Sequence, residues 1–298
     1  MEKRQFGKTD MQVTALGFGG AEVGFERAAQ EDVNRLLSSA LDAGLNVIDT
    51  AECYGDSEEM IGNAVGHRRS EYYLFTKCGH SAGIDLPDWS PELLERSIER
   101  SLQRLKTDCV DLVQLHTCSE EMLRQGDVIA VLQRARDAGK TRYIGYSGDH
   151  KAARYAVECG AFDSLQTSVN IADQESLTLT LPLARERNMG VIAKRPIANA
   201  AWRTGEKPTN SYLHLYWDRL QLLDYDFLKS DLNASISIAL RFTLSTPGVH
   251  TAIVGTANPE RWPQNAALLN EGPLASDLYE AIRARWQAVT QPDWRGQA

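Results

Sequence analysis

The sequence lacks the features that mark a membrane, secreted or nucleic-acid-binding protein. No apolar run approaches the ~18 residues of a membrane-spanning helix, and the opening MEKRQFGKTD has no apolar signal-peptide segment. Acidic residues outnumber basic ones by 40 to 32, for a formal net charge of −8, and no Lys/Arg cluster supplies a basic face. We therefore expect a cytoplasmic protein with no membrane or nucleic-acid partner.

Cysteine is scarce as well, with an odd count of five and no CxxC spacing. This pattern argues against both a disulfide framework and a zinc site, and we expect no bound metal. We interpret all five as reduced thiols. Cys53 and Cys78 are expected to be small buried filler, with redox-sensitive thiols as the alternative.

What the chain does contain is an ordinary globular composition, 43% hydrophobic and 24% charged. Its 298 residues would allow two domains, but α/β barrels of this length are commonly one domain. We expect a single domain over residues 1–298.

Strand-like apolar runs alternate with helical patterns along the whole chain. The runs lie near residues 13–18, 45–50, 72–77, 110–116, 142–147, 164–169, 190–195 and 251–255. Strands that alternate with helices pair in parallel, and eight such units close most naturally into a (β/α)8 TIM barrel, an α/β fold. A doubly wound sheet is the alternative.

Local signals at the ends of the predicted elements support this pattern. Ser90-Pro91 is typical of a helix start, and Gly44, Gly139 and Gly190 follow helical stretches as expected stops. Two short alternating runs near the amino terminus predict a β-hairpin that plugs one end of the barrel. Residues 277–289 predict an extra C-terminal helix.

Two segments are longer than plain connections, 78–90 and 196–232. Long connections in a compact domain are commonly lids or functional loops. Trp89, Trp202 and the aromatic stretch 212–217 are therefore candidate lid residues, with core packing as the alternative.

Reactive side chains gather at the carboxyl ends of the predicted strands, where barrel enzymes carry their active sites. Asp49, Lys77 and His116 end strands, and Tyr54 follows Asp49 in the same loop. A free tyrosine has a pKa of ~10, so proton transfer near neutral pH asks for a lowered pKa, which a nearby cation would supply. We expect Lys77 to be that cation, held by Asp49, while His116 orients a carbonyl oxygen.

The chain resembles the aldo-keto reductase family in LGFGG, DTAECYG, FTKCG, DLVQLH, YIGYSG, SLQTSVN and GTANPERWPQN, which span nearly its whole length. The resemblance implies NADP(H), or else NAD(H), bound across the barrel mouth without a Rossmann domain. It also implies hydride transfer between the cofactor and a small-molecule aldehyde, ketone or alcohol, with catalytic residues Asp49, Tyr54, Lys77 and His116.

The predicted cofactor site departs from the family pattern in several places. Ser147 and Gln166 resemble the groups that clamp the nicotinamide carboxamide, with Asn170 as a helper, but Gly148 and Asp149 stand where Asn usually follows the serine. Arg195 lies where relatives place a flat group against the nicotinamide. The full set predicted to bind cofactor is Ser147, Gln166, Asn170, Arg195, Gly255, Thr256, Arg261, Gln264 and Asn265.

The last five of these residues lie in one segment. Gly255 and Thr256 lead into a predicted helix start that suits phosphate, and Arg261 suits an adenosine 2′-phosphate. Gln264 and Asn265 resemble adenine-binding residues, although the family more often has Glu at the first of these positions. The lysine that many members carry near Gly255 is missing, so Arg261 is the main support for NADPH.

Two other classes of function compete with this enzyme. The same fold could serve as a nucleotide-sensing regulatory subunit, against which the complete tetrad argues. A barrel hydrolase or isomerase is a third reading. Neither the substrate nor the oligomeric state follows from the sequence.

Overall fold

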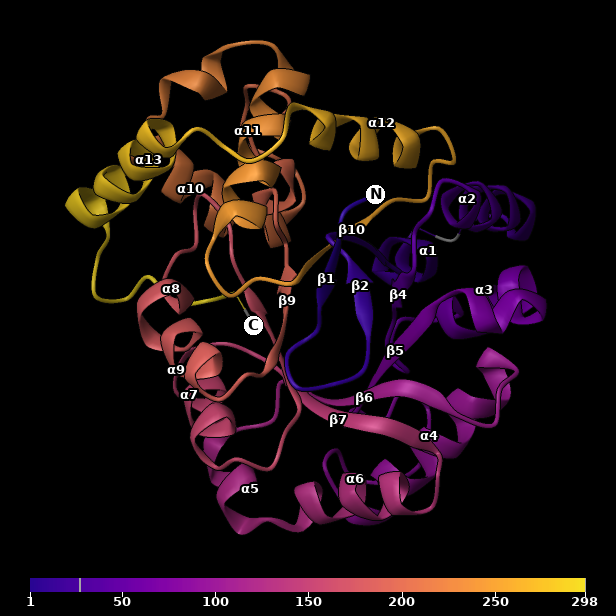
Figure 1. Cartoon of the computed structure of the whole chain (residues 1–298). Helices are drawn as coiled ribbons and strands as arrows, with labels where there is room; N and C mark the ends of the chain where they lie inside the picture. The colour runs from indigo at the N-terminus through magenta and orange to yellow at the C-terminus, as the bar shows by residue number, and fades with distance from the viewer. Residues whose placement is uncertain (27, 298) are drawn as a thin grey trace.

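The strand-like runs form a closed parallel barrel of eight strands, as the alternating pattern predicts (Figure 1). The computed structural model describes residues 1–26 and 28–297. Hydrogen bonding between the last strand and the first closes the barrel, so the doubly wound alternative is wrong. The barrel strands are β3 (Leu16–Gly19), β4 (Val47–Asp49), β5 (Tyr73–Cys78), β6 (Val110–His116), β7 (Thr141–Ser147), β8 (Ser164–Ser168), β9 (Gly190–Lys194) and β10 (Thr251–Gly255).

Helices surround the barrel. They are α1 (Ala21–Phe25), α2 (Gln30–Asp42), α3 (Ser57–Val65), α4 (Pro91–Leu105), α5 (Glu120–Gln125), α6 (Asp127–Asp137), α7 (His150–Glu158), α8 (Ser176–Leu179), α9 (Leu181–Glu186), α10 (His214–Leu223), α11 (Leu232–Ser245), α12 (Arg261–Ala267) and α13 (Ser276–Val289). The last is the predicted extra helix. Within the described residues, none of these helices has the length and apolar character needed to cross a bilayer.

The sequence signals at the helix ends are confirmed with one exception. Ser90 caps α4 by accepting a hydrogen bond from the Leu93 amide, and Gly44 and Gly139 adopt positive φ after their helices. Gly190 is not a helix stop, because Asn188 takes the left-handed conformation there. Gly190 instead leaves room for the ring of Phe6, whose Cε1 atom would lie 2.4 Å from an added Cβ.

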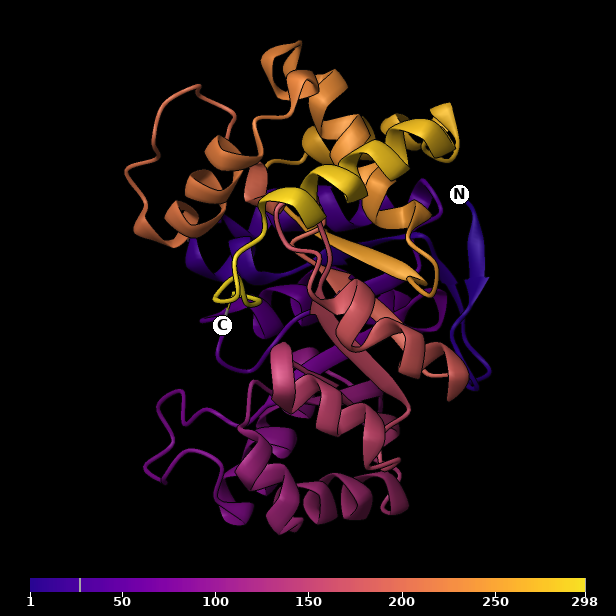
Figure 2. The same ribbon diagram turned by 90° about the vertical axis from the view of Figure 1, so that its left-hand side faces the viewer.

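The predicted hairpin is present and closes the amino end of the barrel. Strands β1 (Lys3–Gln5) and β2 (Gln12–Thr14) pair antiparallel, so the run at residues 13–18 is divided between β2 and β3. The turn between them buries Phe6 and Met11 completely, and Phe6 stacks on Phe75 with ring centroids 5.7 Å apart. Figure 2 shows the hairpin and the C-terminal segment at opposite ends of the barrel.

The two long connections differ in character. Residues 79–90 contain no regular helix or strand, whereas 196–232 contains α10 and several short 3-10 turns. Trp202 is buried in a second apolar cluster beside the barrel, where its Nε1 donates to Ser235 Oγ at 3.0 Å. Trp202 is thus a core residue and not a lid.

Candidate active site

The predicted catalytic residues lie together at the carboxyl end of the barrel. Lys77 Nζ donates to Asp49 Oδ1 at 2.5 Å and to the Thr50 carbonyl at 2.7 Å. The same ammonium lies 5.1 Å from the centre of the Tyr54 ring. The Tyr54 and His116 rings are 5.6 Å apart in an edge-to-face arrangement.

Two glutamines complete the surroundings of the carboxylate. Gln114 Nε2 lies 3.3 Å from Asp49 Oδ2, and Gln166 Nε2 lies 3.2 Å from Asp49 Oδ1. Gln114 also donates to Gln166 Oε1 at 3.0 Å. Gln114 was not singled out from the sequence, but it precedes His116 by two positions and therefore faces the same side of its strand.

Burial governs the titration of the tyrosine and the lysine. Burial raises the pKa of the Tyr54 phenol, and the Lys77 ammonium offsets this only in part. The direction of this shift is opposite to the lowering of the Tyr54 pKa that the sequence suggested. Burial opposes the charge on Lys77, but Asp49 and Tyr54 outweigh it and raise the pKa of Lys77. At neutral pH the phenol keeps its proton and the amine its charge.

His116 is neutral at the same pH. Burial lowers its pKa well below the usual value, and the nearby cations Lys77 and Lys194 act in the same direction. A neutral imidazole has one N–H donor and one acceptor nitrogen, so its tautomer decides what it can offer a ligand.

The residues predicted to hold the nicotinamide carboxamide differ in the hydrogen bonds that they already make within the protein. Ser147 is buried, and its Oγ has no hydrogen-bond partner among the residues that the structure describes. Asn170 is engaged at both ends, since it donates to the Arg195 carbonyl at 3.0 Å and accepts from the Ala172 amide at 2.8 Å. The Gln166 amide already donates a hydrogen bond to Asp49. The free hydroxyl of Ser147 is thus the group best placed to meet a ligand.

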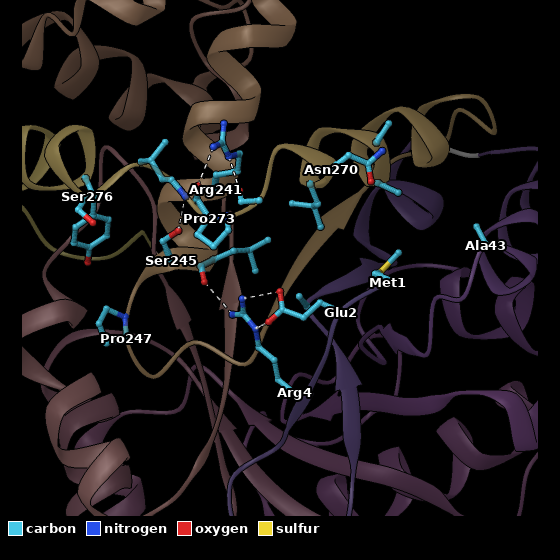
Figure 3. Close-up of a pocket in the computed structure, with 18 of the residues that line it drawn as sticks. Met1, Glu2, Arg4, Ala43, Arg241, Ser245, Pro247, Asn270, Pro273 and Ser276 are labelled. Carbon is cyan, nitrogen blue, oxygen red and sulfur yellow. Dashed lines mark hydrogen bonds and ion pairs between the residues drawn. The ribbon is translucent and has the colours of Figure 1, made fainter.

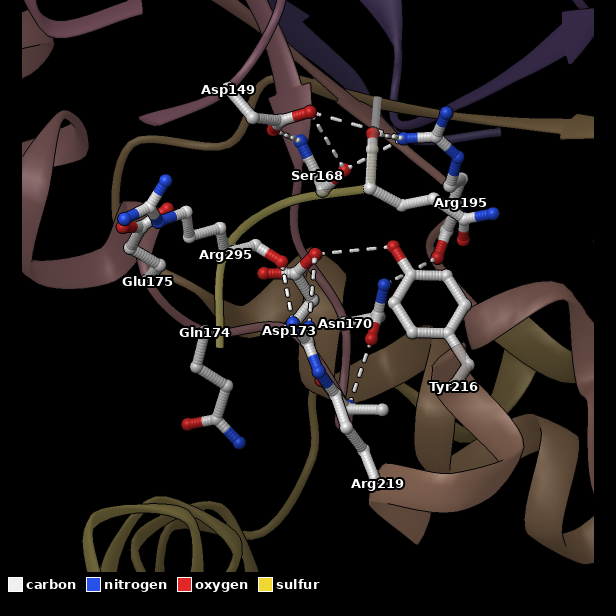
Figure 4. Close-up of polar contacts among 12 residues, drawn as sticks. Asp149, Ser168, Asn170, Asp173, Gln174, Glu175, Arg195, Tyr216, Arg219 and Arg295 are labelled. Atoms are coloured by element: carbon white, nitrogen blue, oxygen red, sulfur yellow. Dashed lines mark hydrogen bonds and ion pairs between the residues drawn. The ribbon is translucent and has the colours of Figure 1, made fainter. Parts of the chain in front are cut away.

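Asp149, which follows the variant Gly148, anchors a buried polar network at the rim (Figure 4). Its carboxylate accepts from Thr167 Oγ1 at 2.8 Å and from the Ser168 amide at 2.7 Å. It also forms an ion pair with Lys194 Nζ at 2.9 Å. Burial alone would raise the pKa of Asp149, but Lys194 and the Ser168 N–H outweigh it and keep it below the usual value.

Arg195 is held at the rim by neutral groups and by a longer ion pair, in which its Nη1 lies 3.9 Å from Asp149 Oδ2. Its guanidinium donates to Tyr212 Oη at 2.9 Å, to Ser168 Oγ at 3.0 Å and to the Gln297 carbonyl at 2.6 Å. The residue that shares the inward face with the rest of β9 is its neighbour Lys194, two positions after Ile192. Sequence reasoning selected Arg195 and missed Lys194.

These features coincide with those of one protein family. Residues 15–287 match the Aldo/keto reductase family. The chain belongs to the aldo/keto reductase family. The resemblance noted in the sequence is confirmed, and with it the oxidoreductase class to which named members of the family belong.

Similarity to known members extends over almost the full chain. It is 28% identical to L-galactose dehydrogenase of Arabidopsis thaliana, over 91% of this chain and 89% of that protein. It is 27% identical to the NADH-specific methylglyoxal reductase of Escherichia coli, over 95% and 99% of the two chains. Among solved structures, the holo form of aldo-keto reductase AKR11C1 from Bacillus halodurans superposes with a TM-score of 0.84 at 25% identity, over 98% and 99%.

The predicted phosphate and adenine segment of this aldo-keto reductase is a turn followed by a short helix. Thr256 Oγ1 accepts from the Asn258 amide at 3.0 Å, and Asn258 Oδ1 accepts from the Glu260 amide at 2.9 Å. The helix α12 begins at Arg261, later than the predicted start, and has seven residues. Because it is so short, the helix dipole is a weak argument for a phosphate site.

The side chains of this segment face different surroundings. Arg261 and Gln264 are exposed, whereas Asn265 is buried. A Cβ on Gly255 would collide with the carboxylate of Glu22, so the side chain of Glu22 lies directly on this glycine. A negative group next to the predicted phosphate position was not foreseen from the sequence.

A separate cavity of about 880 Å³ lies away from the catalytic residues (Figure 3). Its lining includes Arg4 and Arg241, whose guanidinium groups already bond backbone carbonyls and the carboxylates of Glu2 and Glu271. It touches the hairpin end of the barrel, opposite the catalytic mouth. The cavity therefore does not belong to the reaction centre.

Proposed function

We propose that this aldo-keto reductase transfers a hydride between NADP(H) and an aldehyde or ketone, or the corresponding alcohol, with Tyr54 as general acid and base. The observation that carries the proposal is the assembly of Tyr54, Lys77, Asp49 and His116 at the carboxyl end of the barrel. Each member supplies a group that carbonyl reduction requires.

Tyr54 supplies the proton. Its raised pKa keeps the phenol protonated at neutral pH, so it can donate to the oxygen of a carbonyl as negative charge develops there. The Lys77 ammonium stabilises the phenolate that remains. Asp49, with Gln114 and Gln166, holds that ammonium in place.

His116 acts on the same oxygen as a neutral hydrogen-bond donor. Its edge-to-face contact with the Tyr54 ring keeps both groups on one side of the mouth. A carbonyl oxygen that accepts hydrogen bonds from both Tyr54 and His116 is fixed in position. The carbonyl carbon is then oriented for hydride transfer.

The residues at the mouth fit a nicotinamide cofactor. The buried hydroxyl of Ser147, which has no hydrogen-bond partner within residues 1–26 and 28–297, suits a carboxamide, with Gln166, Asn170 and Arg195 as the other proposed contacts. When bound, the nicotinamide supplies or accepts the hydride. Gly255, Thr256, Gln264 and Asn265 are proposed to hold the remainder of the dinucleotide.

Exposed Arg261 favours NADPH because a guanidinium pairs well with a phosphate. The name of the Escherichia coli relative states NADH specificity for that protein, so both cofactors belong in the test.

Incubation of the purified protein with NADPH or NADH and a panel of aldehydes and ketones tests the proposal. We expect consumption of reduced nicotinamide with at least one carbonyl, and oxidation of the matching alcohol with NADP⁺. Tight cofactor binding without turnover of any carbonyl would instead support a sensor or regulatory subunit. If titration shows no binding of either cofactor, a barrel hydrolase or isomerase becomes the favoured interpretation.

A further inference from the structure

The thiol of Cys53 contacts the imidazole of His116. Cys53 Sγ lies 3.4 Å from His116 Nδ1. Cys53 directly precedes Tyr54 in the loop after β4, so it approaches the imidazole from the same segment as the phenol. A thiol beside the orienting histidine was not expected from the sequence, where Cys53 was interpreted as apolar filler.

The His116 ring has little freedom to turn. Tyr54 lies against it edge-to-face on one side, and His80 does so on another with ring centroids 5.3 Å apart. Among the described residues, Cys53 is the one hydrogen-bond partner of the ring. The second nitrogen, Nε2, has no partner within the same set. One nitrogen is thus fixed by the protein and the other is left for a ligand.

The direction of this hydrogen bond follows from the chemistry of the two groups. Burial raises the pKa of the Cys53 thiol and lowers the pKa of His116, so both are neutral. Sulfur is a weak acceptor, whereas an unprotonated imidazole nitrogen is a good one. The favoured pairing therefore has the thiol donating to Nδ1, which leaves the ring proton on Nε2.

We propose that Cys53 is a positioning residue that holds His116 as the Nε2–H tautomer, with that N–H turned toward the carbonyl-binding space. This inference rests on the proposed carbonyl reduction for its kinetic consequence. Its structural part, the S–H to Nδ1 hydrogen bond, stands without it. The reverse tautomer would present a lone pair to the carbonyl oxygen and repel it.

Three substitutions separate the hydrogen bond from the space that the thiol fills. Cys53→Ala removes both, Cys53→Val keeps bulk without a donor, and Cys53→Ser keeps a donor. We expect kcat to fall about threefold to tenfold in the Ala and Val variants with KM changed less than twofold, because one modest hydrogen bond is lost. We expect Cys53→Ser to recover most of kcat. Cys159→Ala, at the end of α7, serves as the matched control.

Long-range ¹H–¹⁵N spectra of the histidine rings test the structural part independently of turnover. In the parent, we expect the His116 signals to show an unprotonated Nδ1 and a protonated Nε2. In Cys53→Ala the Nδ1 resonance should shift toward the position of a nitrogen without a donor, and Cys53→Ser should restore it.

A parent spectrum with the proton on Nδ1 would overturn the proposal. So would a Cys53→Ala variant whose kcat and Nδ1 resonance match the parent, and so would a Val variant as active as Ser. If the parent reduces no carbonyl at all, the proposed function fails, while the spectra still decide whether the thiol sets the tautomer. Should the Val variant fail to fold, the comparison of Ala with Ser decides alone.

Discussion

Lys77 Nζ lies 5.1 Å from the centre of the Tyr54 ring and at the same time donates to Asp49 Oδ1 at 2.5 Å. The lysine therefore serves two partners, a carboxylate that holds it and a phenol that it acts upon.

Tyr54→Phe should lower the rate of carbonyl reduction about 10²–10⁴-fold, because a positioned general acid contributes roughly that factor. Cofactor affinity should stay within about twofold of the parent, since the ring and its packing are retained. Steady-state kinetics and fluorescence titration with NADPH measure the two quantities. Parent-like turnover by the phenylalanine variant would remove Tyr54 from the reaction.

The raised pKa of Tyr54 predicts opposite pH dependences for the two reaction directions. Reduction needs the protonated phenol, so its kcat/KM should stay level through neutral pH and fall only above pH ~10. Oxidation needs the phenolate and should accelerate as pH rises. A fall in reduction centred near neutral pH, after correction for cofactor stability, would mean that another group is the acid.

Arg261→Ala should weaken NADPH binding about tenfold, the loss expected for one charge-assisted contact, and leave NADH binding within twofold. Isothermal titration with each cofactor gives the ratio. Arg96→Ala, on the exposed face of α4, is the control for a general change in surface charge. Equal losses for NADPH and NADH would show that Arg261 does not meet the 2′-phosphate.

Lys194→Met should reduce the free energy of unfolding by about 3 kcal/mol, because it removes the nearer of the two cations that pair with the buried carboxylate of Asp149 and leaves only Arg195 at 3.9 Å. The double variant Lys194→Met/Asp149→Asn should be less destabilised. Equilibrium unfolding in urea measures both. As a control, Lys207→Met breaks an exposed ion pair with Asp218 and should lower the free energy of unfolding by under about 1 kcal/mol. A similar loss of stability in both lysine variants would show that burial of the ion pair has no special effect.

We expect the buried carboxyl group of Asp173 to make the free energy of unfolding depend on pH. Burial, with the nearby carboxylate of Asp149, raises the pKa of Asp173 to about 7, whereas the unfolded chain has a value of ~3.9. Between these values the folded state binds more protons, so the free energy of unfolding should fall as pH rises through this window. Asp173→Asn should flatten that fall in urea unfolding from pH 4 to 8, and exposed Asp218→Asn should not.

The barrel, and the gathering of the four predicted residues at its carboxyl end, could be predicted because they depend on local patterns. Apolar runs of strand length marked each barrel strand, and the ends of those strands marked Asp49, Lys77 and His116. Ser90 and Gly44 bounded helices for reasons that a few neighbouring residues supply. None of these inferences required knowledge of distant contacts.

What could not be predicted depends on residues far apart in the chain. The pKa of Tyr54 is raised because the assembled protein buries the phenol, a desolvation that no local spacing reveals. The pair of Lys194 with Asp149 requires the loop after β7 to meet the end of β9 across the intervening strand β8. Gly190 resembled a helix stop, yet its role is set by Phe6, which lies near the start of the sequence.

The amino-terminal hairpin of β1 and β2 determines from which end a ligand can approach the active site. Phe6 and Met11 are fully buried in its turn, so this hairpin covers the amino end of a barrel whose interior is already filled by apolar side chains. A ligand of Tyr54 should therefore enter and leave from the carboxyl end, where the loops that follow the strands surround this residue.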